Sequence, residues 1–342
     1  MEFRLVLNDT WINLKMPFKN STNNFNLSGQ DLENKLKAIF ESTLQVQSVP
    51  PGANYFEFGL NPILTTKILI EIQKVINRKV DIAAFFLAPT IKKLASYLLE
   101  DGESKHFNVI PIQPNGNKTP LFLVGAILSY YSLSLQMGSD QPVYGFKPPS
   151  KYKIKELARL YISKLLIIQP EEPYIIGGFC SGGIIAFEMA QQLIAAGKNV
   201  ELLILFESYT PNGLLKKNSL EYINRKMITS NFDSVVHSIT KYVKHSKNVL
   251  KMLRSSKEKD KNFFRRGYIL KSYPEEIILF NAQKSMYYSQ DEPFLGWDKY
   301  CDQKKITVCE LPGNHTALFQ GSNIVQISAK IKIVIQKNTL VL

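Results

Sequence analysis

The sequence predicts a two-domain protein, in which a small all-α domain precedes a larger α/β domain. Before residue 105, apolar residues recur at intervals of three and four positions, as in amphipathic helices. Beyond residue 120, short apolar segments typical of buried strands alternate with helical patterns. The chain of 342 residues has room for one domain of roughly 75 residues and one of roughly 235.

The all-α domain is expected over residues 29–100. Its helical spacing is carried by two groups of residues: Leu32, Leu36, Ile39, Phe40 and Leu44, then Ile63, Ile68, Ile72 and Val75. A third helix is expected to begin near Thr90, a favourable N-cap after Pro89. Residues 1–28, rich in Asn and Lys, predict a flexible arm, and the Gly and Pro residues of 101–119 predict a linker. The α/β domain would then cover 120–342.

A glycine-rich turn follows the apolar strand Tyr174–Ile176 and leads at once into a helix. The turn contains Gly178-Phe179-Cys180-Ser181-Gly182, which has the layout of the α/β-hydrolase nucleophile elbow, G-x-S-x-G. In this register Cys180 occupies the apex, and Ser181 supplies only a backbone N–H. The alternatives are a strand–helix turn with a buried cysteine, or a phosphate-binding loop. The absence of G-x-G-x-x-G counts against a phosphate-binding loop.

An acid and a base follow the candidate nucleophile in the chain order of this fold. Glu207 lies at the end of the apolar strand 200–208, at the edge where sites of parallel sheets form. His315 follows the predicted strand 306–310. A lone histidine is more often structural, but the order Cys180, Glu207, His315 favours a catalytic role. The other histidines, at 106, 237 and 245, fall in the linker and a lysine-rich region.

From about Val109 to its end, the chain resembles the thioesterase domain that terminates nonribosomal peptide and polyketide synthases. The resemblance is carried by Val109–Pro114, Asp140–Phe146, the elbow and the Gly313-Asn314-His315 segment. It implies an α/β-hydrolase fold with a helical lid over about 212–271. It also implies Cys180 as nucleophile, His315 as base and Glu207 as acid.

This chain departs from that family in its catalytic residue types. Cysteine replaces the usual serine and glutamate the usual aspartate, and both changes leave the chemistry possible because a thiolate is the stronger nucleophile. Asp291, after the predicted strand 277–280, is the alternative acid. The loop after strand 121–124 is shorter than the family's, so the oxyanion-hole N–H groups are expected from Ser181 and Ala126.

The segments Tyr55–Leu64 and Phe85–Ile91 resemble an acyl or peptidyl carrier domain, whose motif is Phe-x-x-x-Gly-Gly-x-Ser-Leu. Pro62 stands in the position of the serine that carries phosphopantetheine, and Leu60 in that of the second glycine. Proline has no hydroxyl to modify, although it suits the first turn of a helix. Thr65 and Thr66 are poor substitutes. The sequence therefore predicts no bound cofactor, with substrate presented on phosphopantetheine by another carrier protein or by coenzyme A.

Charge and composition narrow the possible partners. The net charge is +13, and residues 212–271 hold fifteen Lys and Arg against four Asp and Glu, a net +11. This segment is either a solvated surface or a region that attracts an acidic carrier protein or upstream synthase module. Nucleic acid is not expected, because no recognised binding fold accompanies the charge. Three unpatterned cysteines predict neither disulfides nor a metal site. No signal peptide or membrane span is expected, which indicates a cytoplasmic protein.

Two functions therefore remain. One is a thioesterase that releases, transfers or cyclises an acyl or peptidyl chain through an acyl-Cys180 intermediate, and the order of nucleophile, acid and base favours it. The other is a catalytically degenerate docking or scaffold protein of a synthase assembly. Pro62 and the short oxyanion loop favour that alternative.

Overall fold

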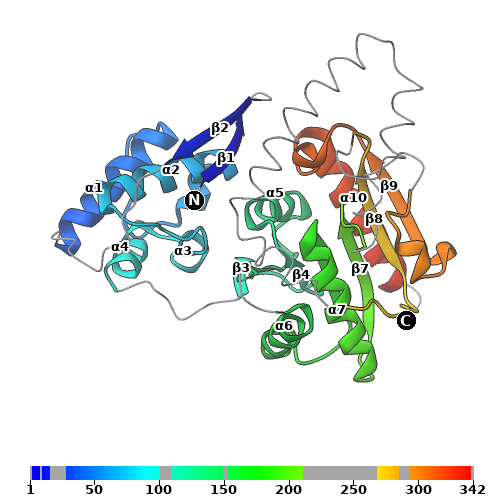
Figure 1. Ribbon diagram of the computed structural model, residues 1–342. Helices are drawn as coiled ribbons and strands as arrows, with labels where there is room; N and C mark the ends of the chain where they lie inside the picture. The colour runs from blue at the N-terminus through cyan, green and yellow to red at the C-terminus, as the bar shows by residue number, and fades with distance from the viewer. Residues whose placement is uncertain are drawn as a thin grey trace, which may run out of the picture. The chain divides into compact units, whose positions relative to one another are not determined.

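The computed structural model describes residues 2–7, 10–15, 28–100, 109–148, 153–210, 268–284 and 293–339. The chain divides into two compact units, Met1–Phe107 and Asn108–Leu342 (Figure 1).

The first unit is mainly helical. Its helices are α1 (Gly29–Leu44), α2 (Pro62–Ile76), α3 (Ala83–Leu87) and α4 (Ile91–Leu99), with a 3-10 turn η1 (Tyr55–Phe58). Helix α1 packs against both α2 and α4. The side chains predicted for the core are buried: Leu32, Leu36 and Phe40 on α1, and Ile68 and Ile72 on α2. Tyr55 joins them, and its hydroxyl lies 2.7 Å from the carbonyl oxygens of Phe85 and Ala88.

Side-chain caps fix where these helices begin. The Thr90 hydroxyl accepts a hydrogen bond from the N–H of Lys93, so α4 starts at the predicted position. Asn61 Oδ1 accepts from the N–H groups of Ile63 and Leu64, both at 3.0 Å, at the start of α2. Helix α3 was not predicted, because five residues are too few to show a helical period.

The expected flexible arm is wrong for its first part. Strands β1 (Glu2–Leu7) and β2 (Thr10–Lys15) form an antiparallel pair in which Leu7 lies opposite Thr10. Both strands are rich in β-branched, aromatic and other apolar residues, and an Asn-Asp pair separates them in sequence. The Asn and Lys content of the whole segment hid this hairpin signal.

The second unit is built on a seven-stranded sheet with the order β3-β5-β4-β6-β7-β8-β9. Its strands are β3 (Val109–Gln113), β4 (Leu121–Val124), β5 (Val143–Phe146), β6 (Tyr174–Phe179), β7 (Val200–Phe206), β8 (Ile277–Ala282) and β9 (Ile306–Leu311). β3 is antiparallel to β5, and the other neighbours are parallel. Every residue of β4 and β8 is buried, as expected for strands covered on both faces.

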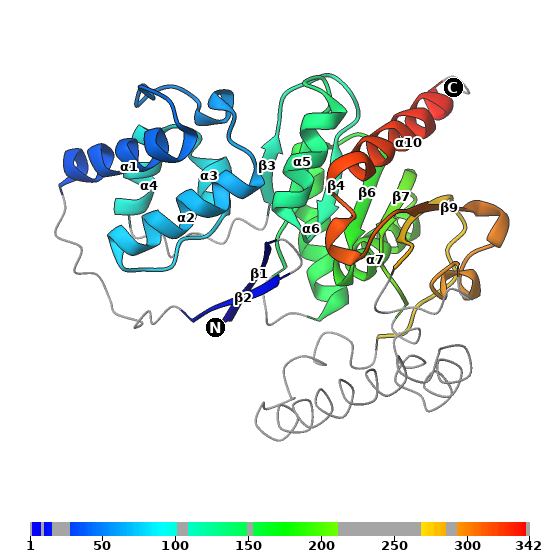
Figure 2. The same cartoon turned by 90° about the horizontal axis from the view of Figure 1, so that it is seen from above.

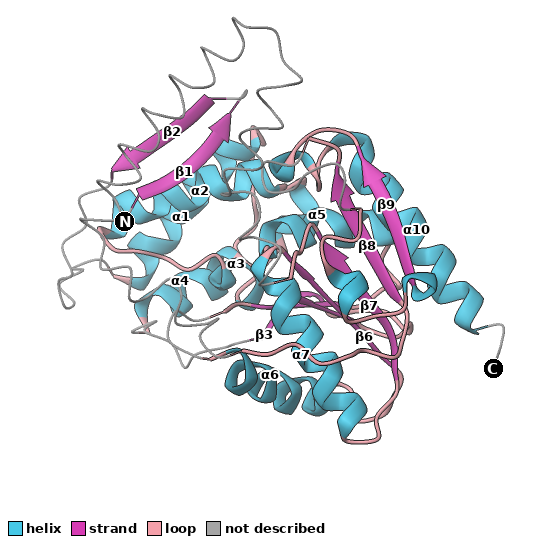
Figure 3. Ribbon diagram, turned by 45° about the vertical axis from the view of Figure 1, so that its right-hand side comes forward, coloured by secondary structure: helices cyan, strands magenta, loops and turns pink. Residues whose placement is uncertain are grey.

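Helices cover both faces of this sheet. Helices α5 (Ile127–Met137) and α10 (Gly321–Thr339) lie on one face, and α6 (Ile154–Ile168) and α7 (Ser181–Ala195) on the other (Figure 2). The parallel strands run between these two layers (Figure 3). Short 3-10 turns η3 (Trp297–Lys299), η4 (Gln303–Lys305) and η5 (His315–Ala317) complete the described part. The three layers confirm the predicted α/β class.

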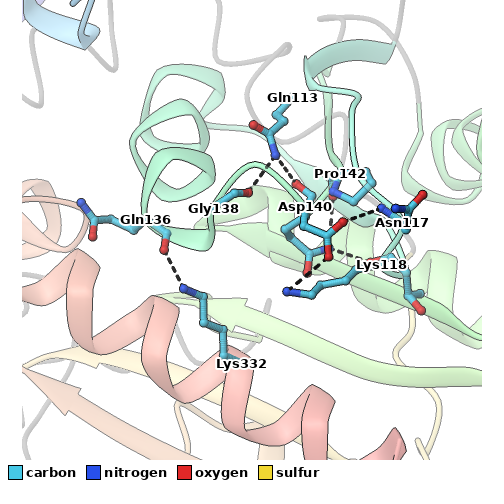
Figure 4. Close-up of polar contacts among 10 residues, drawn as sticks. Gln113, Asn117, Lys118, Gln136, Gly138, Asp140, Pro142 and Lys332 are labelled. Carbon is cyan, nitrogen blue, oxygen red and sulfur yellow. Dashed lines mark hydrogen bonds and ion pairs between the residues drawn. The ribbon is translucent and has the colours of Figure 1, made fainter.

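The expected linker 101–119 is too long at its C-terminal end, because Val109–Gln113 form edge strand β3. Pro111 suggested a linker, yet proline is tolerated on an edge strand. The Gln113 side chain then donates hydrogen bonds to the carbonyl oxygens of Gly138 and Gln141, at 2.9 and 2.7 Å (Figure 4). Residues 109–119 thus belong structurally to the second unit.

The turn between β3 and β4 is held by Asp140, whose Oδ1 accepts from the N–H of Asn117 at 3.0 Å (Figure 4). On the same side of the sheet, Lys332 of α10 donates to the carbonyl oxygen of Gln136 on α5 at 2.9 Å. These contacts tie the end of α5 to α10 and the segment after α5 to the β3–β4 turn.

Most of the lid expected over 212–271 lies outside the described residues, which resume at Tyr268. Within the part of the chain that the structure describes, no helix combines the length and apolar character needed to cross a membrane.

Candidate active site

Cys180 occupies a strained turn between β6 and α7. Its backbone has φ 53° and ψ −120°, a conformation that costs a non-glycine residue about 1–3 kcal/mol. The flanking glycines allow the turn to close. A Cβ on Gly178 would lie 2.4 Å from the carbonyl carbon of Gly182, and a Cβ on Gly182 would lie 2.2 Å from the carbonyl oxygen of Val124. The structure therefore has the sharp strand–turn–helix geometry that the sequence predicts.

The Cys180 thiol is half-buried at the N-terminus of α7. Burial alone raises the pKa of this thiol. The hydrogen bond and positive charge of His315, the N–H of Ser181 and the hydroxyl of Tyr209 outweigh it, so the pKa is lowered. The helix N-terminus acts in the same direction. Cys180 is therefore poised to form a thiolate.

A half-buried His315 and a buried Glu207 form a pair beside this thiol. His315 Nδ1 lies 2.9 Å from Glu207 Oε2, and the Glu207 side chain is fully buried. Burial alone lowers the pKa of His315, but hydrogen bonds with Cys180 and Glu207 and the charges of both raise it to about 9. The imidazole thus lies between a thiol and a carboxylate, and it favours its protonated form.

Two aromatic side chains, Phe179 and Phe319, fix the plane of the His315 ring. Phe179 stacks on the imidazole with centroids 4.5 Å apart and an interplanar angle of 23°. Phe319 meets Phe179 edge-on, at 5.4 Å and 79°. Such contacts hold the imidazole in position and stabilise its cationic form.

Two helix N-termini meet near Cys180. Helix α7 begins at Ser181 and α5 begins after Ala126, and neither start has a side-chain cap. The first-turn N–H groups of a helix have no partner within the helix. Gly182 approaches the end of β4 closely, which brings the two starts together. The backbone of Ser181 interacts with the Cys180 sulfur and that of Ala126 with the Tyr130 hydroxyl, so the role of these two N–H groups as oxyanion donors stays a prediction.

The structure brings Cys180, Glu207 and His315 together, with Ser181 and Ala126 beside them. Asp291, the alternative acid, lies outside the described residues. The sequence analysis missed the contribution of Phe179 and Tyr209. Phe179 lies inside the elbow and Tyr209 two residues beyond Glu207, so both flank predicted site residues. Their residue types alone did not indicate a role.

In the described ranges, no group of three His, Cys, Asp or Glu residues could hold a metal ion.

Comparisons with known proteins agree with the fold and with the order of the two units. Residues 122–333 match the family model described as thioesterase domain, and residues 34–98 match the model for the phosphopantetheine attachment site. The chain therefore belongs to the thioesterase-domain family, a hydrolase class, and its first unit is related to carrier domains. Its fold is that of the α/β-hydrolases.

Similar proteins are synthases many times longer. Indigoidine synthase of Dickeya dadantii is 29% identical over 206 residues, which cover 57% of this chain and 14% of that protein. Chondramide synthase of Chondromyces crocatus is 24% identical over 357 residues, which cover 88% of this chain and 9% of that protein. A four-domain nonribosomal peptide synthetase bound to AMP and glycine superposes with a TM-score of 0.51 and 21% identity, over 93% of this chain and 27% of the synthetase.

Proposed function

We propose that this chain is a thioesterase that uses Cys180 as its nucleophile. Its substrate would be an acyl or peptidyl chain bound as a phosphopantetheine thioester, in nonribosomal peptide or polyketide biosynthesis in the cytoplasm. The observation that carries the proposal is the contact series from Cys180 through His315 to Glu207, with 2.9 Å between the last two. A thioesterase-family fold around that series supports it.

In the first step, the Cys180 thiolate attacks the carbonyl carbon of the substrate thioester. The resulting oxyanion would accept hydrogen bonds from the N–H groups of Ser181 and Ala126. When the intermediate collapses, the substrate C–S bond breaks and the departing pantetheine sulfur takes the proton of the His315 imidazolium. The products of this step are acyl-Cys180, a free thiol and a neutral imidazole.

In the second step, the neutral His315 takes a proton from the attacking group. Water would release an acid, whereas an amine or hydroxyl within the acyl chain would release a ring. Expulsion of the Cys180 thiolate then restores the starting pair of thiolate and imidazolium. The Glu207 carboxylate holds Nδ1 protonated and stabilises the charged ring throughout.

The first unit has the fold of a carrier domain without its attachment chemistry. Residue 62 is proline at the start of α2, so the position has no hydroxyl. The Thr65 hydroxyl is fully buried and donates to the carbonyl oxygen of Asn61 at 2.8 Å. These residues do not fit a covalently held phosphopantetheine. We infer that substrate arrives on another carrier protein, on an upstream module or on coenzyme A, and that the first unit serves in docking.

A degenerate scaffold remains the second candidate, since Pro62 indicates that one of the two units has lost its chemistry. It predicts binding to synthase modules without turnover. The strained elbow at Cys180 and the contact between Glu207 and His315 favour the enzyme, because both place groups where catalysis by Cys180 needs them, and the strained backbone costs stability.

A panel of acyl thioesters on coenzyme A and on carrier proteins separates the two candidates. The enzyme should release thiol, and Cys180→Ala and His315→Ala should each abolish that release. Cys309→Ala is the matched control and should retain full activity. Thiol release that persists in Cys180→Ala would overturn the assignment of the nucleophile.

Priming tests the proposal for the first unit. Incubation with a promiscuous phosphopantetheinyl transferase and coenzyme A should add no mass to residues 29–100. A Pro62→Ser variant restores the hydroxyl and is the matched positive test. A modified wild-type peptide in this range would show that the chain carries its own substrate.

A further inference from the structure

The hydroxyl of Tyr209 lies 3.9 Å from Sγ of Cys180. Tyr209 follows β7 two residues after Glu207, and its side chain is only 6% exposed. Hydrogen bonds to sulfur are longer than those to oxygen because the sulfur atom is larger. The contact is therefore within reach of a hydrogen bond.

The direction of this hydrogen bond depends on the charge of the sulfur. A thiol can donate to the phenol oxygen, whereas a thiolate can only accept, so the phenol must then donate. Hydrogen bonds to an ionised partner are about twice as strong as neutral ones. The Tyr209 hydroxyl therefore interacts more favourably with the thiolate than with the thiol.

Other groups also face this sulfur from the elements around it. His315 contributes a hydrogen bond and a charge from η5, and the N–H of Ser181 contributes from α7. Tyr130 of α5 lies close enough to interact electrostatically, but its hydroxyl is buried and lies 2.8 Å from the carbonyl oxygen of Val124. Glu207 contacts His315, the neighbour of the sulfur, at 2.9 Å. Tyr209 is thus the phenol whose hydroxyl contacts the sulfur itself.

We infer that Tyr209 is a positioning residue whose hydroxyl donates a hydrogen bond to the Cys180 thiolate and keeps that sulfur in its reactive form. This inference rests on the proposed function, because it takes Cys180 as the nucleophile. Acylation removes the charge from the sulfur and weakens the donation, and expulsion of the thiolate in the second step restores it. Tyr209 would thereby ease release from a cysteine, which replaces the family's serine in this chain.

The test is the pH dependence of Cys180 alkylation by iodoacetamide, followed on the isolated peptide by mass spectrometry. Tyr209→Phe removes the hydroxyl and keeps the ring, which packs in the core next to Cys180. We expect the midpoint of the profile to rise by about one pH unit. Below the midpoint, alkylation should slow about tenfold, whereas the limiting rate at high pH should be unchanged.

Tyr161→Phe is the matched control. The Tyr161 ring is also buried, and its hydroxyl has no hydrogen-bond partner among the described residues. Its midpoint should equal that of the wild type. Tyr209→Leu, which also lacks the hydroxyl, gives a second measurement should the phenylalanine variant fold poorly, and it should shift the midpoint in the same direction.

Two results would overturn the inference. One is a wild-type midpoint in the Tyr209 variants, and the other is an equal shift in Tyr161→Phe. A different result would refute the proposed function itself. In that case the wild-type Cys180 would titrate like an ordinary thiol, near pH 8.5, and would react with iodoacetamide no faster than Cys309.

Discussion

Two substitutions of Glu207 separate the effect of its charge on His315 from its effect on the orientation of the ring. Glu207→Gln keeps an oxygen that can accept from Nδ1 but removes the negative charge. Glu207→Asp keeps the charge but shortens the side chain by one methylene, about 1.5 Å. The 2.9 Å contact would then open to about 4.4 Å, beyond hydrogen-bond distance. Glu207 has a positive φ of 40°, which aspartate tolerates well, so Glu207→Asp should not strain the backbone.

The size of each effect follows from the environment of His315. Its pKa is raised to about 9, in part by the hydrogen bond and charge of Glu207. A neighbouring opposite charge shifts a pKa by about 1–3 units, so Glu207→Gln should lower that of His315 by about 1–2 units. At pH 8 the protonated fraction of His315 would then fall from about 90% to between about 50% and 10%, so thiol release should fall about 2- to 10-fold. Glu207→Asp should lower the pKa less but reduce turnover by a similar factor, because the ring loses its orientation.

NMR titration of the His315 imidazole and thiol release from an acyl thioester measure the two effects. The chain has four histidines, so a His315→Gln spectrum assigns the signal. The reasoning is refuted if both variants keep the wild-type pKa of His315 and turnover within twofold. If Asp291→Ala abolishes turnover while the Glu207 variants do not, Asp291 is the acid.

Three further predictions follow from the same site. Iodoacetamide should label Cys180 well before Cys301 and Cys309, because the pKa of Cys180 is lowered. Burial raises the pKa of Cys301 to about 12 and also raises that of Cys309. Equal labelling of the three cysteines would contradict this prediction. Thiol release should rise from acid pH as Cys180 ionises below its ordinary pKa, and fall near pH 9 as His315 loses its proton; a fall near pH 6.5 would show that the pKa of His315 is not raised. Gly183→Ala should destabilise the second unit by about 1–3 kcal/mol, because the new Cβ would lie 2.2 Å from Oγ and 2.4 Å from Cβ of Ser208. Urea unfolding should show rescue by Ser208→Gly but not by Ser208→Ala, which keeps the clashing Cβ.

The elements that the sequence predicted well are those with strong local signals. Strand β4 matches its predicted bounds, Leu121–Val124, because all four residues are apolar and buried. Helix α4 begins at the predicted cap because Thr90 supplies the hydroxyl for it. The elbow was predictable because close backbone contacts around Cys180 admit only glycine at Gly178 and Gly182.

The elements that were missed depend on pairing across the chain. Strand β3 is a strand because it lies against β5, and its proline suggested a linker. The β1–β2 hairpin was hidden by the polar composition of its segment. The contacts of Tyr209 with Cys180 and of Phe179 with His315 depend on how β6, β7 and η5 meet, and no spacing along the chain encodes their distances.

Trapping of the acyl-enzyme tests the central claim most directly. The protein is mixed with an acyl-thioester panel, quenched in acid within the first turnover and measured by intact mass, then digested to locate the adduct. The account predicts a mass increase equal to the acyl group on the Cys180 peptide, lost on incubation with hydroxylamine and absent in Cys180→Ala. Thiol release with no adduct on Cys180, or an adduct on Ser181 that persists in Cys180→Ala, would contradict it.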